Sequence, residues 1–255
     1  MGRDLEISSY FPHVVLDRRR VVRLFKALAA TGLRVGAPDP ERYPLLDAVT
    51  PAGAAGVRIA VDDVEDLLRS RSGAVPLGHG FIPLLGRVPG VAGPAVATMQ
   101  FSIHSAAHPE LDGLRLRFDD ASLRPPATDP DDPVGPGWQA VLTWYGVICD
   151  QLRVAYGYGD WEDLFLQTVI PPSRRDVLNG RVDMLYRVNC FGPALVGRYG
   201  RMHILATPAA AVVGLRYGGV LIGEKLRYHG DDDEQFRRAA AHLQLRTRAD
   251  QLRPA

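Results

Sequence analysis

Two runs of alternating hydrophobic and polar residues form the sharpest pattern in this chain. The first run contains Met99, Phe101 and Ile103, and the second contains Leu114, Leu116 and Phe118. Alternation of period two places the hydrophobic side chains on one face of a strand, and a turn-like segment over 108–113 separates the runs. The pattern therefore predicts an antiparallel hairpin with one face on the core and the other facing water or a helix.

Helical periodicity occurs on both sides of this hairpin. Hydrophobic residues recur every three to four positions over 138–156, and more briefly over 17–30 and 231–243. Further helices are expected to begin at Asp62, Asn189 and Thr207, where capping residues or an early proline occur. The remaining apolar segments predict strands, and Pro12 places the first of them at an edge or a bulge. These strands are expected over 7–16, 57–61, 182–188, 202–205 and 220–226.

Together these elements predict an α+β fold with a mixed, mainly antiparallel sheet and helices packed on one face. Both ends of the chain repeat the order strand, helix, strand, helix, which allows two similar α/β halves. We expect an N-terminal half over 1–120 and a C-terminal half over 138–245, unless the two form one continuous domain. A Pro- and Asp-rich connection over 121–137 joins them, and residues 246–255 are expected to fray.

Composition and charge narrow the functional classes. The chain has 255 residues, 46% hydrophobic and 23% charged, with a formal net charge of +1. A dedicated nucleic-acid binder would carry a concentrated basic excess, so we expect no nucleic-acid partner. Neither a leader segment nor a membrane-length apolar run is visible, which predicts a cytoplasmic protein without membrane association. Cys149 and Cys190 are then expected to be buried thiols rather than a disulfide.

Residues that could carry catalysis are few. Cys190 precedes a predicted helix and has His203 as its nearest histidine in sequence, and Asp119-Asp120 is a paired carboxylate. His104 and His108 have metal-ligand spacing, but Pro109 argues against the helix that this spacing needs. No nucleotide-binding glycine motif is present, so the sequence predicts no cofactor and no metal. A small-molecule enzyme using Cys190/His203 or Asp119/Asp120 remains the alternative to a binding protein.

The segment 156–165 differs from the rest of the chain because it combines large aromatics, acids and flexible glycines. Such a loop would suit a basic protein partner, since aromatic side chains give contact area and the acids give charge complementarity. If the segment binds a partner, Trp161→Ala should weaken binding and leave thermal stability nearly unchanged. The alternative is that Trp161 and Phe165 fold back on the core. The candidate partner-binding residues are Tyr156, Tyr158, Asp160, Trp161, Glu162 and Asp163.

A resemblance to a known family comes from residues 180–226. This stretch contains an aromatic-rich segment ending in Asn189-Cys190-Phe191-Gly192-Pro193, then Arg198-Tyr199-Gly200, Ala206-Thr207-Pro208, and Tyr217-Gly218-Gly219-Val220. It resembles the C-terminal part of bacterial immunity proteins of polymorphic-toxin and type VI secretion systems. The resemblance covers under a quarter of the chain. It implies a small cytoplasmic α/β protein that binds and neutralises a cognate toxin without catalytic residues of its own.

Overall fold

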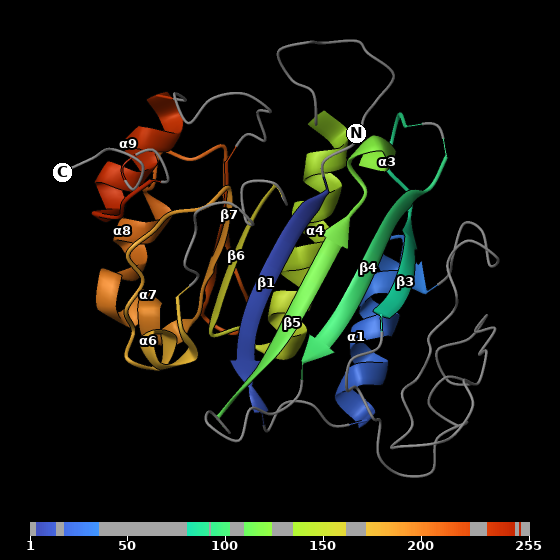
Figure 1. Ribbon diagram of the computed structural model, residues 1–255, viewed down its shortest axis with the longest axis horizontal. Helices are drawn as coiled ribbons and strands as arrows, with labels where there is room; N and C mark the ends of the chain where they lie inside the picture. The colour runs from blue at the N-terminus through green and yellow to red at the C-terminus, as the bar shows by residue number, and fades with distance from the viewer. Residues whose placement is uncertain are drawn as a thin grey trace.

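The fold is built on one continuous antiparallel sheet (Figure 1). The computed structural model describes residues 4–13, 18–35, 81–91, 93–102, 110–123, 135–161, 172–224, 234–247 and 250. Within them, nine strands follow the order β2-β3-β4-β5-β1-β6-β7-β9-β8. The strands are β1 (Leu5–Pro12), β2 (Leu33–Val35), β3 (Phe81–Gly86), β4 (Ala95–Ser102), β5 (Leu111–Phe118), β6 (Tyr156–Trp161), β7 (Val188–Phe191), β8 (Ala211–Gly214) and β9 (Val220–Gly223). The predicted α+β class with an antiparallel sheet is confirmed.

The predicted hairpin is the pair β4 and β5. Its register places Met99 opposite Leu116 and Phe101 opposite Leu114, and all four side chains are buried. Period-two patterning therefore identified the core face correctly. The expectation that Pro12 places this strand at an edge or a bulge is wrong, because β1 lies between β5 and β6. Pro12 ends β1 opposite Leu111 of β5, at a position beyond the last pair with β6. A residue without an N–H is tolerated there because the strand has only one paired neighbour at that point.

Two long helices cover one face of the sheet. They are α1 (Arg18–Ala30) and α4 (Gly135–Leu152), and Figure 1 shows both behind β1, β5 and β4. Trp144 of α4 stacks on Phe118 with ring centroids 6.1 Å apart, and its indole N–H donates to the carbonyl of Thr31. The stripe predicted over 138–156 is confirmed up to Leu152. Gly32, at φ +88°, follows the end of α1, where the left-handed conformation favours glycine.

Shorter helices pack on the opposite face, over β6, β7 and β9. Their apolar residues form a second core with Tyr156, Phe191 and Ile222, whose side chains point away from α4. The expectation that helices pack on one face is therefore incomplete. These helices are α6 (Arg174–Leu178), α7 (Pro193–Tyr199), α8 (Arg201–Leu205) and α9 (Glu234–Leu243), and a further helix, α3 (Asp120–Leu123), precedes α4.

Several short segments differ from their predicted conformations. Residues 202–205 belong to helix α8 rather than a strand, and the helix expected from Thr207 is replaced by β8 and a turn into β9. The strand expected over 182–188 instead begins at Val188 and takes in Asn189, where a helix was expected to begin. Each segment is too short for its own periodicity to decide. In β7 and β8, pairing with β9 overrides the local preference. The elements expected from 57 to 68 lie outside the described residues.

The two predicted halves share this one sheet. Strand β1 pairs on one side with β5 and on the other with β6, which belong to the N-terminal and C-terminal segments respectively. The core under α4 likewise draws residues from both segments, among them Ile7, Leu116 and Leu221. Strand β1 therefore joins the two segments at the centre of the sheet.

Candidate functional site

The segment predicted to be a recognition loop is a strand. Residues 156–161 form β6, which lies between β1 and β7 near the middle of the sheet. The side chains of Tyr156, Tyr158 and Trp161 are all buried, and Trp161 is 0% exposed. The expectation of an exposed aromatic loop is therefore wrong for these three residues, while Glu162 and Asp163 lie outside the described part of the chain.

Close packing explains why this segment alternates glycine with aromatic residues. A Cβ atom on Gly157 would lie 1.7 Å from the hydroxyl oxygen of Tyr145, and one on Gly159 would lie 2.8 Å from Cγ1 of Ile7. The glycines thus face α4 and the neighbouring strand, where no side chain fits. Tyr156 and Tyr158 point to the other face. Period-two alternation of glycine and tyrosine was the signal that could have identified the strand.

Tyr156 and Tyr158 belong to an aromatic cluster beneath the second helical layer. Their rings stack at 5.7 Å, and Tyr158 also contacts Tyr186 at 5.0 Å between ring centroids. Burial raises the pKa of the Tyr158 hydroxyl well above its ordinary value, so it stays protonated. These tyrosines therefore belong to the buried core between the sheet and the shorter helices.

Asp160 occupies a different environment from the other described candidates. It is half-buried and lies opposite Glu6 in the β1–β6 register, on the sheet face that points away from α1 and α4. Glu6 lies opposite Arg117 of β5, which in turn lies opposite Thr98 of β4. A row of polar side chains therefore crosses four strands. We call this surface the polar face; it consists of Asp4, Glu6, Ser8, Thr98, Gln100, Arg115, Arg117 and Asp160.

Two ion pairs order the polar face. The Nε of Arg115 lies 3.0 Å from Oε1 of Glu6, and the side-chain exposures are 56% and 11%. Arg117 pairs in the same way with Asp4, at exposures of 45% and 22%. In both pairs the acidic side chain is more buried than the arginine. The ion pair therefore holds the guanidinium in place while the arginine still faces solvent.

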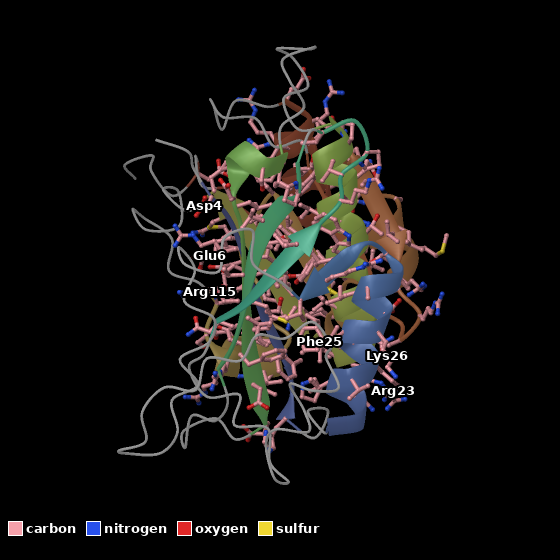
Figure 2. The ribbon with its side chains drawn as sticks, turned by 90° about the vertical axis from the view of Figure 1, so that its right-hand side faces the viewer. Asp4, Glu6, Arg23, Phe25, Lys26 and Arg115 are labelled. Carbon is pink, nitrogen blue, oxygen red and sulfur yellow. The ribbon has the colours of Figure 1, made fainter. Side chains whose placement is uncertain are left out.

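No described helix covers this part of the sheet. In Figure 1, β1, β5 and β4 face the viewer directly, and α1 and α4 lie behind them. Figure 2 shows Asp4, Glu6 and Arg115 on one side of the sheet, and Arg23 and Lys26 of α1 on the other. Among the described residues, the polar face therefore presents two partly exposed arginines on the central strands of the sheet.

The residues of the enzyme alternative are not brought together by the fold. Cys190 is fully buried on the α4 side of the sheet, where its Sγ lies 3.3 Å from the hydroxyl of Tyr217. His203 is on α8, in the layer on the opposite side, and stacks on His242 with ring centroids 4.1 Å apart. Asp119 directly precedes α3, at the position of a helix cap, and its carbonyl accepts from the Ser122 hydroxyl.

Buried thiols are confirmed at both cysteines, which are free. Burial raises the pKa of the Cys149 thiol, which keeps it protonated and unreactive. His104 and His108 lie outside the described residues. Among the residues that the structure does describe, no three His, Cys, Asp or Glu side chains gather as a metal site would require. The helices described are all too short or too polar to cross a membrane.

The fold defines an α+β protein with a nine-stranded antiparallel sheet, and its similarity to known proteins was found in solved structures. Comparison with known protein families and with curated protein sequences finds no match. Among solved structures, the fold is similar to that of the type VI secretion system (T6SS) protein PA0821 from Pseudomonas aeruginosa. The TM-score is 0.52 at 14% sequence identity, and the alignment covers 95% of this chain and 76% of that chain. The similarity therefore extends over nearly the whole described fold.

Proposed function

We propose that this chain is a T6SS-associated immunity protein that binds and neutralises a cognate bacterial toxin. The observation that carries the proposal is the fold shared with a T6SS protein over 95% of the chain. The resemblance of residues 180–226 to bacterial immunity proteins supports it independently, because it rests on sequence motifs and not on the fold.

The polar face is the surface that we propose for toxin binding. Arginine is enriched at protein interfaces, and its planar guanidinium can donate two parallel hydrogen bonds to a carboxylate of the partner. Arg115 and Arg117 are already held by Glu6 and Asp4, so ordering them on binding costs little side-chain entropy. Asp160 adds an acidic side chain on the same face. It is the one residue of the predicted partner-binding segment that we retain in this proposal.

This function is tested by the growth of a bacterium that carries neither the gene for this chain nor the gene for its toxin. The tagged chain would be used to capture partners from its own host, and a stoichiometric partner would be identified by mass spectrometry. We expect that partner to arrest growth when expressed alone, and co-expression of this chain to restore growth. A captured partner that is harmless, or whose toxicity this chain does not relieve, would contradict the proposal.

The double variant Arg115→Ala/Arg117→Ala tests the surface separately from the fold. Because both ion pairs are partly exposed, we expect each to contribute about 1 kcal/mol or less to the free energy of unfolding. Affinity for the captured toxin, measured by calorimetry, should fall at least about tenfold.

A matched control for this variant lies on the opposite side of the molecule. Arg23→Ala/Lys26→Ala removes two exposed cations from α1, on the far side of the sheet in Figure 2, and should leave toxin affinity unchanged. Equal losses of affinity in the Arg115/Arg117 and Arg23/Lys26 variants would mean that general charge, and not the polar face, attracts the toxin.

A further inference from the structure

The two cysteines of the chain lie on elements that pack against each other. Cys149 is on α4 and Cys190 is on β7, and both side chains are 0% exposed. Tyr145 precedes Cys149 by about one turn of α4, and a Cβ added to Gly157 would lie 1.7 Å from its hydroxyl oxygen. Gly157 is in turn paired with Cys190 in the β6–β7 register. Both cysteines therefore belong to the same region of core between α4 and the sheet.

Hydrogen bonds connect the two cysteines both directly and through the end of α4. The Cys149 thiol is hydrogen-bonded to the side chains of Cys190 and Tyr145. The Sγ of Cys190 is 3.3 Å from the hydroxyl of Tyr217, which donates to the carbonyl of Val154 at 2.7 Å. The amide of Val154 donates to the carbonyl of Cys149 at 3.2 Å. The two thiols are therefore neighbours in the core, as a disulfide requires.

The tyrosine hydroxyls beside the cysteines do not depend on the thiols for their hydrogen bonds. The Tyr145 hydroxyl is 2.8 Å from Oγ of Ser9, and the Tyr217 hydroxyl donates to the carbonyl of Val154. A buried hydroxyl that loses its partner costs free energy, but both hydroxyls keep a partner when the thiol hydrogens are removed. The core therefore accepts an apolar S–S bond in place of the two S–H groups.

We propose that Cys149 and Cys190 form a disulfide when the chain folds under oxidising conditions, and that the bond ties α4 to β7 without displacing either element. One cysteine thiolate attacks glutathione disulfide, forms a mixed disulfide and releases the first reduced glutathione. The other cysteine then attacks the mixed disulfide, forms the S–S bond of the protein and releases the second. Each released glutathione takes up the proton that a cysteine gave up, so the protein is oxidised and the glutathione disulfide is reduced. The inference concerns the covalent state of the chain and is independent of toxin binding.

Burial determines when this exchange takes place. Because both cysteine side chains are 0% exposed, glutathione reaches their sulfur atoms only before α4 packs on the sheet. The same packing shields the disulfide from reductants once it has formed. The reduced pair described above is the form acquired under reducing conditions, so the redox poise at the time of folding selects between the two forms.

Refolding at a defined redox poise tests the proposal without any substitution. The denatured, reduced chain would be refolded either with an excess of glutathione disulfide or with reduced glutathione alone. Remaining thiols would then be alkylated in denaturant, and the products identified by mass spectrometry. We expect an intramolecular bond between Cys149 and Cys190 in the first case and two alkylated cysteines in the second. Two free thiols, glutathione attached to either cysteine, or disulfides between chains after oxidative refolding would overturn the proposal.

Denaturation by urea provides the second measurement. A crosslink restricts the unfolded chain, so the urea midpoint of the oxidised protein should exceed that of the reduced protein by about 1 M. Cys149→Ala and Cys190→Ala are the matched controls, because each leaves one thiol and should gain no stability from refolding with glutathione disulfide. An oxidised form that is no more stable than the reduced form, or an equal gain in the controls, would contradict the proposal that α4 and β7 hold the pair in position for bonding.

Discussion

Gly157→Ala is expected to lower the free energy of unfolding by about 3 kcal/mol or more. Gly157 lies on β6 beneath α4, where an added Cβ would come within 1.7 Å of the Tyr145 hydroxyl oxygen. That hydroxyl is 2.8 Å from Oγ of Ser9, and Tyr145 is fully buried. The methyl group would displace a ring that has no free space and would break a buried hydrogen bond, and each effect costs about 1–3 kcal/mol.

A double-mutant cycle identifies the hydroxyl as the cause. Tyr145→Phe removes the atom at 1.7 Å and leaves the ring carbon Cζ, which is 3.0 Å from the added Cβ. Gly157→Ala should therefore cost at least about 1 kcal/mol less in the Tyr145→Phe background than in the unmodified chain. Chemical denaturation of the four proteins gives this interaction energy.

Gly146→Ala is the matched control for the glycine substitution. Gly146 lies in α4, and an added Cβ would meet only Leu221 and Leu215 at ordinary distances of 3.8 and 3.9 Å. Alanine favours a helix over glycine by about 1 kcal/mol, so this variant should be neutral or more stable. A small effect of Gly157→Ala, comparable with that of Gly146→Ala, would mean that α4 does not pack against β6 as described.

Trp161→Ala is expected to destabilise the protein by about 3–5 kcal/mol, as large-to-small substitutions in a core do. Trp161 lies opposite Leu5 of β1 and belongs to the core covered by α1 and α4. This outcome is the reverse of the one that a recognition loop predicts. Trp161→Phe preserves most of the buried apolar volume and should cost less than about 1.5 kcal/mol.

Affinity for the toxin distinguishes a structural role of Trp161 in the core from a direct contact with the partner. The Trp161→Phe protein remains folded, and we expect its affinity for the captured toxin to equal that of the unmodified chain. A stable Trp161→Ala protein with reduced affinity would show that the indole contacts the partner and that its burial in β6 is incorrect.

The elements that the sequence determined by itself are those whose periodicity extends over many residues. Helix α4 has 18 residues, and its apolar stripe repeats through several turns, so one face is specified wherever the helix packs. The hairpin of β4 and β5 is similar, because alternation over two strands specifies which face of each strand is buried. Helix α9 was predicted for the same reason, and its residues Phe236, Ala239, Ala240 and Leu243 are buried as expected.

Only the tertiary structure decided the conformation of the shorter elements and the location of the candidate site. Strand β6 has aromatic and acidic residues that suit a surface loop, yet pairing with β1 on one side and β7 on the other buries its tyrosines and its tryptophan. Its neighbour β1 is more than a hundred residues away in sequence, so no local pattern could indicate this pairing. The polar face arises in the same way, because Glu6, Arg115 and Asp160 come from three separate strands and become neighbours only when the sheet forms.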